Sequence, residues 1–538
     1  MKNKYSDLLK SKWFFIFILC LIVSTLYCQT LFHDLIFLDD DTLIFNKFTG
    51  MDLNEKISSS FNSNFLNGHY YRPITSLSFV VDSFFSVRSY FAYHFTNFLI
   101  HLVTSILIFL IIKNMGYSLL VSLVSALLFA INPININAVG WIAGRGDLLA
   151  TLFSIFALLL YLKFIKYNKA SLLIFVSVLL FLAILSKEVS LLVPFLFLIL
   201  YFVEKKELLL NKSSISVLLM TIIVFTSYYL LRGIFLSRVH IDKFSFTAYY
   251  RNILVLPETI SKFFIPTGIK ALPSTELFTS ISGIIIFVLI LIIPFKFNSI
   301  NKYRYYFGFL WFIFLLIPGM VFRTMEQDGF YYWDCRSYLP LIGIIFMIAE
   351  IVRVLDLQKC KKLCFLLIMI YLLILSAFTF VKIQMYQNPI TYWNAVKTDY
   401  PSRYLPYIGL YNYYNHYKDL NNAEIQLLRA IEISPADFTI RKMLLDFYLT
   451  NNEKRKALLL AKDTLEKDVS DSDYFIEIFV SLSIELGQMD VINNLLIKKS
   501  DNEKIIELIR KLLKLKVESL KNDGNRLKSN LLFEKFLR

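Results

Sequence analysis

The chain has 538 residues, of which 57% are hydrophobic and 16% aromatic. This apolar content exceeds the roughly 45–50% of soluble globular domains, so composition excludes a soluble domain and predicts a multi-span membrane protein. Lysine and arginine exceed aspartate and glutamate by 56 − 41 = 15. The part after Pro389 contains 23 basic and 21 acidic residues, so the part before it contains 33 basic and 20 acidic residues. The basic surplus therefore belongs to the apolar part, which favours cytoplasmic loop lysines and argues against a nucleic-acid partner.

About eleven apolar segments are long enough, or nearly so, to cross a hydrocarbon core of ~30 Å with ~20 helical residues. They are predicted at 13–32, 91–112, 117–136, 147–165, 171–186, 189–203, 214–236, 281–297, 304–322, 339–355 and 362–381. Basic residues cluster in alternate loops, which places those loops and the N-terminus in the cytoplasm. The predicted fold class is thus all-α, a polytopic helical bundle over residues 1–386, with 33–90 as the first extracytoplasmic loop.

The loop after the first span carries three adjacent carboxylates, Asp39, Asp40 and Asp41. Three like charges in a row repel, so the run predicts either a bound cation or a proton acceptor with a perturbed pKa. A solvated acidic loop explains the run equally well. We interpret it as the catalytic end of a membrane enzyme.

Two further polar groups follow in the next loop and span. Arg72, between Tyr71 and Pro73, is a fixed planar cation suited to a phosphate, or it forms a structural salt bridge to Asp40. His94, Asn97 and His101 share one face of the second span. They line a substrate tunnel or form hydrogen bonds between helices, since polar groups in spans usually face the bundle interior.

Later outer turns carry charges of both signs. Arg145 and Asp147 begin the fourth helix, where backbone N–H groups attract anions. Lys187 and Glu188 interrupt an apolar run, which is costly unless they are paired or bound to a ligand. We predict that Lys187 binds a lipid-linked phosphate; a self-contained Lys187–Glu188 turn is the alternative. Before the tenth span lie Tyr338 and Arg336, a further candidate for the phosphate.

After Tyr386 the apolar runs shorten and a 34-residue helical period emerges. Ala423, Leu427, Ala430 and Pro435 occupy places expected in a tetratricopeptide repeat, and the pattern recurs over the next 34 residues before it decays. Small alanines allow paired antiparallel helices to approach closely. Residues 387–538 are therefore predicted to form a tetratricopeptide-repeat α-solenoid.

Taken together, one ordered series of motifs runs through the chain: Asp39-Asp40, Tyr71-Arg72-Pro73, Tyr93-His94, Asn132-Pro133 through Arg145 and Asp147, Ser186-Lys187-Glu188, Arg336 with Tyr338, and then the repeats. This series resembles the transmembrane and tetratricopeptide repeat-containing O-mannosyltransferases and their bacterial relatives. Those belong to the GT-C class of polyprenyl-phosphate-sugar glycosyltransferases.

The resemblance implies roles for individual residues. The base falls on Asp39 or Asp40, with Asp41 leaving the register open by one. Asp147 matches the second-loop carboxylate, and Lys187 and Arg336 match ligands of the lipid phosphate. Two positions depart from the relatives, which often have histidine and glutamate where Asn132 and Asn137 stand here.

The resemblance thus implies an inverting glycosyltransferase that moves a sugar, mannose or another hexose, from a polyprenyl-phosphate carrier to extracytoplasmic protein Ser or Thr hydroxyls. A carboxylate would take the acceptor proton and cations would hold the departing phosphate. The repeats would present or recruit the acceptor. A divalent cation at Asp39 and Asp40 remains open, and no other cofactor is expected.

Two other interpretations are weighed against this one. In the first, the enzyme transfers the sugar to a lipid or a cell-envelope glycan. In the second, the chain is a non-catalytic flippase or scaffold with peptide-binding repeats. Richness in Lys, Asn and Ile suggests an AT-rich bacterial genome. This places the protein in the bacterial inner membrane, with the repeats outside the cytoplasm.

Overall fold

The chain forms two compact units, residues 1–399 and 400–538, each of which is described by itself. The computed structural model describes residues 11–46, 48, 50–63, 65, 70–86, 89–205, 212–235, 249–250, 252–273, 275–321, 332–356, 361–467, 473–498 and 503–522. Over these ranges the regular structure is helical, apart from one isolated antiparallel bridge between Phe65 and Tyr70. The predicted all-α class is confirmed for this part of the chain.

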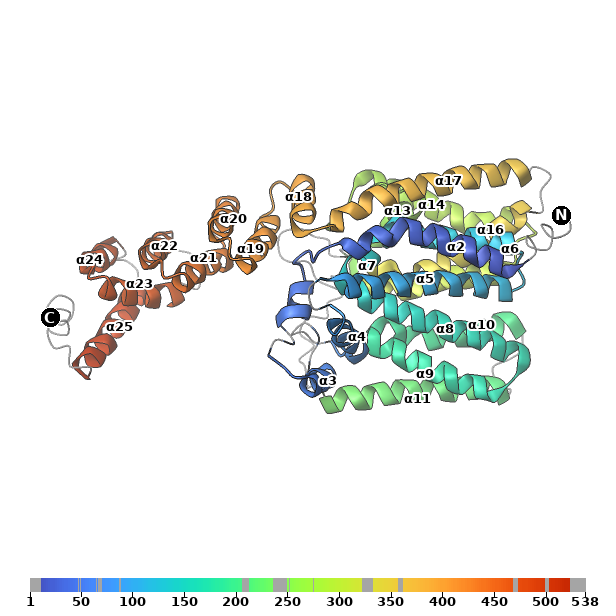
Figure 1. The fold of residues 1–538 in the computed structure, drawn as a ribbon, viewed down its shortest axis with the longest axis horizontal. Coiled ribbons are helices and arrows are strands. Elements are labelled where there is room, and N and C mark those ends of the chain that lie inside the picture. The colour runs from blue at the N-terminus through green and yellow to red at the C-terminus, as the bar shows by residue number, and fades with distance from the viewer. Residues whose placement is uncertain are drawn as a thin grey trace. The chain divides into compact units, whose positions relative to one another are not determined.

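The first unit is a bundle of long apolar helices that run alongside one another (Figure 1). Among the described residues, seven helices are long and apolar enough to cross a membrane. They are built on α2 (Lys12–Tyr27), α5 (Phe91–Asn114), α8 (Arg145–Tyr167), α11 (Lys212–Phe235), α14 (Leu277–Lys296), α15 (Lys302–Leu316) and α17 (Lys361–Lys382).

The other four predicted spans are helical but shorter or broken. The helix α6 (Leu119–Ala130) bends by 47° against Pro133–Gly140, because a proline cannot donate the next helical hydrogen bond. Three more are α9 (Ala170–Ser186), α10 (Val193–Lys205) and α16 (Leu341–Asp356), of 17, 13 and 16 residues. At 1.5 Å per residue these helices are shorter than a ~30 Å hydrocarbon core. The described residues thus hold seven candidate spans, or eight if the bent pair counts as one.

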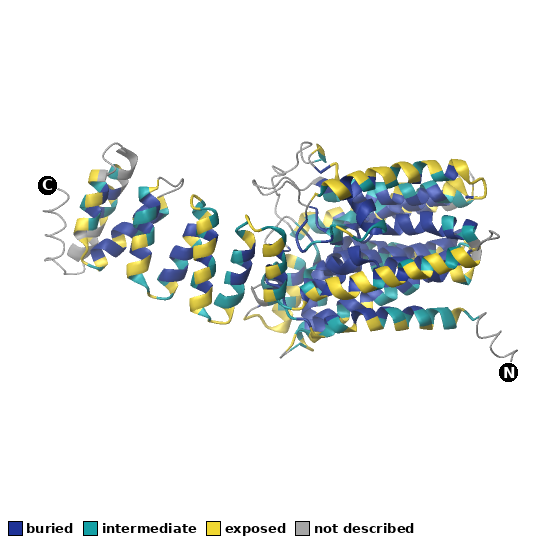
Figure 2. Cartoon of the chain, turned by 90° about the horizontal axis from the view of Figure 1, so that it is seen from above, coloured by how far each residue is buried: buried dark blue, intermediate teal, exposed yellow. Residues whose placement is uncertain are grey.

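The outward surface of the first unit is apolar. Ile223 on α11, Ile285 on α14 and Leu373 on α17 are 62%, 56% and 66% exposed, and many neighbours are similar. Figure 2 shows buried residues gathered between the helices and exposed residues on their outer sides. Because a soluble protein rarely exposes such large apolar surfaces, this surface is suited to lipid.

Short helices gather at one end of the first unit, which we call the loop end (Figure 1). They are α3 (Leu53–Asn62), α4 (Pro73–Ser83), α7 (Ile136–Gly140) and α18 (Pro389–Asp399). A further short helix of this unit, α13 (Val255–Phe264), packs on α14. The last of the four loop-end helices, α18, belongs to the first unit, and the second unit begins one residue after it.

The second unit is a succession of helices. They are α19 (Leu405–His416), α20 (Leu420–Ile433), α21 (Phe438–Thr450), α22 (Lys454–Glu466), α23 (Asp473–Glu485), α24 (Met489–Lys498) and α25 (Glu503–Asn522). Consecutive helices from α19 to α24 pack on one another, and α25 packs on α23. Small and apolar residues fill the space between them: Ala423, Leu427, Ala430, Ala457 and Ala461 are fully buried. Buried alanines permit close approach of paired helices, as the sequence pattern requires.

The turns inside the helix pairs recur at a regular interval. Lys418, Asn452 and Gly487 all have positive φ, of 62°, 60° and 69°, at separations of 452 − 418 = 34 and 487 − 452 = 35 residues. The residue that follows each of these donates its backbone N–H to a carbonyl of the preceding helix. The donors are Asp419, Glu453 and Gln488, and the distances are 2.9, 2.8 and 2.8 Å. The backbone therefore repeats with the period found in the sequence.

Candidate active site

The acidic run lies in a tight turn that follows the first span at the loop end. Asp40 is buried, and its carboxylate accepts the backbone N–H groups of Ile36 at 2.9 Å and Leu38 at 3.1 Å. Between these two donors, Phe37 has a φ of 55°, in the left-handed region. Both oxygens of Asp40 are therefore occupied in holding the turn.

Asp39 and Asp40 have perturbed acidities. Burial raises the pKa of Asp39 to about 6; the charges of Asp40 and Asp41 raise it further, while Arg336 lowers it. Burial also raises the pKa of Asp40 to about 6, against the opposing effect of its backbone hydrogen bonds. A carboxylate with a pKa near neutrality is suited to accept and release a proton.

Arg336 lies within electrostatic reach of Asp39, although the two are almost 300 residues apart in sequence. Its guanidinium donates to the carbonyl of Gly319 at 3.3 Å. The neighbouring Cys335 is buried, and its backbone N–H donates to Asn137 at 3.0 Å. The structure thus brings one predicted phosphate ligand to the acidic turn.

Asp147 and Lys187 form an ion pair at the same end. Lys187 Nζ lies 2.5 Å from Asp147 Oδ2, and the two side chains are 15% and 7% exposed. Burial raises the pKa of the Cys335 thiol, as does Asp147, while Lys187 and Arg336 lower it. All three charged groups lie within electrostatic range of this thiol, and we call Asp147, Lys187 and Arg336 the charged cluster.

Arg72 and Glu188 form a second ion pair beside this cluster. Two guanidinium nitrogens of Arg72 lie 2.9 and 2.8 Å from Glu188 Oε2, and the guanidinium covers the ring of Tyr70 at 4.3 Å. Thr75, one turn along α4, donates to the carbonyl of Ser186 at 2.9 Å. The loop helix α4 is therefore docked on the turn between α9 and α10, and Arg72 pairs with Glu188 instead of Asp40.

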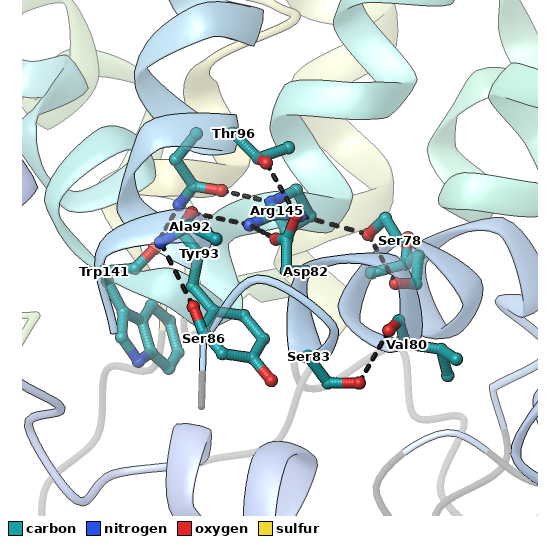
Figure 3. Close-up of polar contacts among 12 residues, drawn as sticks. Ser78, Val80, Asp82, Ser83, Ser86, Ala92, Tyr93, Thr96, Trp141 and Arg145 are labelled. Carbon is teal, nitrogen blue, oxygen red and sulfur yellow. Dashed lines mark hydrogen bonds and ion pairs between the residues drawn. The ribbon is translucent and has the colours of Figure 1, made fainter. Parts of the chain in front are cut away.

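Arg145 lies in a separate, fully buried network (Figure 3). Its guanidinium pairs with Asp82 at 2.8 Å and donates to Ser78 at 3.2 Å and to the carbonyl of Tyr93 at 2.7 Å. Its Nε donates to Asn97 as well. Every guanidinium nitrogen thus has a protein acceptor, and Arg145 joins α4, α5 and α8.

His94 and Tyr338 are buried within the helix packing. The His94 ring is buried and lies 6.0 Å from the ring of His33. The hydroxyl of Tyr338 shares a hydrogen bond of 2.6 Å with His101 Nδ1, and both side chains are fully buried. The bond between Tyr338 and His101 ties α5 to the segment that precedes α16.

Sequence reasoning missed several residues that shape the site. Asp82 holds Arg145, and Lys262 on α13 pairs with Asp334 at 3.0 Å, two residues before Arg336. Trp393 on α18 donates to the carbonyl of Ile36 at 2.8 Å. A charged side chain inside a short apolar helix was the available signal for Asp82 and Lys262, whereas nothing local marked Trp393.

A divalent cation was left open for Asp39 and Asp40. Across the described ranges, no group of three His, Cys, Asp or Glu side chains is arranged to hold a metal ion. Asp40 in addition directs both oxygens at backbone N–H groups. Within the described part of the chain, these side chains therefore do not fit a metal centre.

Comparison with known proteins adds an independent finding. Residues 77–230 match the family described as dolichyl-phosphate-mannose-protein mannosyltransferase. This segment contains Arg145, Asp147, Lys187 and Glu188. It thus includes the two turns at the loop end that meet in the ion pair of Lys187 with Asp147.

Three relatives illustrate the similarity. Protein O-mannosyl-transferase TMTC3 of Mus musculus is 31% identical over 150 residues, 26% of this chain and 15% of the relative. Protein O-mannosyl-transferase TMTC1 of Homo sapiens is 37% identical over 101 residues, which cover 19% of this chain and 11% of the relative. Protein O-mannosyl-transferase F38B6.6 of Caenorhabditis elegans is 31% identical over 96 residues, 17% and 14% of the two chains. The alignments span less than a sixth of each relative, so the similarity concerns a segment. The resemblance to these O-mannosyltransferases is confirmed.

Proposed function

We propose that the first unit is a GT-C membrane glycosyltransferase that moves mannose or another hexose from a polyprenyl phosphate to Ser or Thr hydroxyls of an extracytoplasmic protein. The observation that carries this proposal is the convergence of Asp39, Arg336 and the Asp147–Lys187 pair at the loop end. These residues come from four distant parts of the chain. If each residue had only a structural role, nothing would require these residues to lie close together.

Asp39 is the base in this proposal. As the acceptor oxygen forms its bond to the anomeric carbon, Asp39 takes the hydroxyl proton, and the bond from that carbon to the phosphate oxygen breaks. A single displacement inverts the configuration at the anomeric carbon. Asp40 is less suited to this step because its oxygens already accept two backbone N–H groups.

Arg336 and Lys187 hold the phosphate that departs with the electron pair. Fixed cations in a water-poor site stabilise the developing negative charge without having to reorganise during the reaction. Arg336 also lowers the pKa of Asp39, which favours its ionised form. Arg72, Glu188, Arg145, His94 and Tyr338 support this arrangement by joining the loop to the helices.

In the proposed setting the loop end faces the outside of a bacterial inner membrane. The second unit is a tetratricopeptide-repeat solenoid that recruits the acceptor, as its 34- and 35-residue turn spacing supports. Cysteines introduced at Asp52 and Lys205 test the orientation in a variant without native cysteines. A membrane-impermeant maleimide added to intact cells should label Asp52→Cys and leave Lys205→Cys unlabelled; the reverse pattern contradicts the proposed orientation.

Transfer can be assayed directly with the purified full-length protein, radiolabelled polyprenyl-phosphate mannose and Ser/Thr-containing peptides. We expect Asp39→Asn to lose at least about 100-fold in rate, the range of a general base, while its unfolding temperature does not fall. Asp40→Asn should lose both activity and thermal stability, because it also removes the acceptor of two backbone donors. If the radiolabel is found on an isolated cell-envelope glycan and on none of the peptides, the result would favour a glycan as the acceptor. No transfer from any polyprenyl-phosphate hexose by the wild type contradicts the proposal.

A further inference from the structure

The acidic turn contains a backbone conformation that its own residue does not favour. Phe37 has a φ of 55°, and it is 2% exposed. For any residue with a Cβ atom the left-handed region crowds the following carbonyl, and bulky residues avoid it. Such a conformation persists only where the surrounding structure holds it, and it is found preferentially at functional sites.

The structure holds this turn from both sides. From within, the carboxylate of Asp40 binds the N–H groups of Ile36 and Leu38, which flank Phe37. From outside, the indole N–H of Trp393 donates to the carbonyl of Ile36 at 2.8 Å. The two contacts fix the peptides on either side of Phe37, and Asp39 follows two residues later.

Trp393 is itself firmly placed. It is 1% exposed, and its ring packs edge-on against Tyr392 at 5.1 Å. Just before α18, the carbonyl of Gln387 accepts the N–H of Asp34 at 2.8 Å. A second bond from the same helix, from the Tyr392 hydroxyl to the carbonyl of Ala271 at 3.0 Å, joins α18 to another segment of the first unit. The helix thus forms a rigid support for the turn.

We propose that Trp393 is a positioning residue: through the Ile36 carbonyl it holds the left-handed turn at Phe37 and so aims Asp39 toward Arg336. Its role in catalysis rests on the proposed function, whereas its effect on the turn does not. If Trp393 only filled space, its ring would matter and its N–H would not. The proposal therefore depends on one hydrogen bond.

The decisive comparison is Trp393→Phe, which keeps an aromatic ring and removes the N–H, against Tyr392→Phe, which removes a hydrogen bond elsewhere on α18. In hydrogen exchange of the full-length protein, we expect amides of residues 34–41 to exchange about tenfold faster in Trp393→Phe, the size of one lost hydrogen bond. Tyr392→Phe should leave that segment unchanged. Equal protection of residues 34–41 in the wild type and Trp393→Phe would overturn the proposal.

The catalytic readout separates positioning from a general loss of stability. For Trp393→Phe we expect kcat to fall about tenfold with little change in the KM for the donor, since the turn is not a donor ligand. The acid limb of the pH–rate profile should move below about 6, because a loosened turn admits water to Asp39. The groups that act on Asp39 are Asp40, Asp41 and Arg336, none of which is altered.

A second variant covers failure of Trp393→Phe to fold. Benzothienylalanine at position 393 replaces the indole N–H with sulfur at nearly the same shape, so packing is kept and only the donor is lost. It should reproduce faster exchange over residues 34–41. If this isostere and the wild type protect the turn equally, the proposal is wrong. A wild type without transferase activity would contradict the proposed function, while the exchange comparison would still decide the role of Trp393.

Discussion

Lys187 Nζ lies 2.5 Å from Asp147 Oδ2, so the turn between α9 and α10 meets the first turn of α8 through a charge pair that is almost closed to solvent. The resemblance matches Asp147 to the second-loop carboxylate of the relatives and Lys187 to a ligand of the lipid phosphate. Their contact means that a bound phosphate would share Lys187 with Asp147. The pair therefore serves both the stability of the loop end and, in our proposal, the charge balance of the site.

A double-mutant cycle on this pair should show strong coupling. Lys187→Met or Asp147→Leu alone leaves one charge largely buried, and each should destabilise the protein by about 2 kcal/mol or more. The double variant should be less destabilised than the sum of the two, because no charge is left unpaired. Thermal unfolding in detergent measures the effect. Strictly additive losses would show that the two side chains do not act as a pair.

A rise in pH through about 6 should increase the activity and decrease the stability of the folded protein. Because burial raises the pKa of Asp39 from 3.8 to about 6, the ionised base forms as pH rises through about 6, and kcat/KM should rise with it. The folded state binds this proton more tightly than the unfolded state does. Its stabilising contribution is thus complete below about pH 4 and lost as pH rises through about 6.

Comparison with Asp39→Asn isolates that contribution. From pH 4 to pH 7 the free energy of unfolding should fall more for the wild type than for Asp39→Asn, because the amide carries no buried charge. Chemical denaturation at both pH values provides the measurement. A difference that stays constant across this range would contradict the raised pKa of Asp39.

Arg145 should matter for folding more than a surface arginine. Arg145→Lys keeps the charge but cannot reach Asp82, Ser78, Asn97 and the Tyr93 carbonyl together, so we expect a loss of about 3 kcal/mol. The control is Lys166→Arg in the last turn of the same helix, where the side chain is exposed and the change should be within about 0.5 kcal/mol. Similar losses for both variants would contradict the network in Figure 3.

Two glycines provide a matched test of helix packing. A Cβ atom at Gly343 on α16 would lie 2.2 Å from the carbonyl oxygen of Gly308 on α15, so Gly343→Ala should force the helices apart and lower the unfolding temperature. Gly233 on α11 has no heavy atom within 4 Å of its Cβ position, and Gly233→Ala should be neutral or stabilising by up to about 1 kcal/mol. Tolerance of Gly343→Ala would mean that α15 and α16 are less closely packed.

Truncation should separate the roles of α18 and the second unit. A chain that ends at Asp399 keeps Trp393 and Tyr392, so the first unit should unfold at nearly the full-length temperature. A chain that ends at Tyr386 loses both contacts and should be less stable. In our proposal the longer truncation product transfers sugar to short peptides but poorly to a folded acceptor. Equal stability of the two products would contradict the anchoring role of α18.

Much of the candidate site followed from local chemistry. A carboxylate run beside a span, and a lysine interrupting an apolar segment, are costly wherever they fall, so Asp39, Asp147 and Lys187 could be selected without a structure. Which charge pairs with which was not predictable. The partners of Arg72 and Arg145, Glu188 and Asp82, lie 116 and 63 residues away in sequence and meet them only through helix packing.

Composition and periodicity by themselves determined that this chain is an all-helical protein with an apolar, membrane-suited first part, because the cost of burying polar backbone in lipid leaves few other choices. They also placed helices on all eleven predicted segments, although three are shorter than a full span and one is bent. Only the tertiary structure decided that Asp40 holds the turn while Asp39 lies within electrostatic reach of Arg336, and that Trp393 donates to the same turn. The physical reason is that hydrogen bonds between distant segments depend on packing geometry, which local residue patterns do not encode.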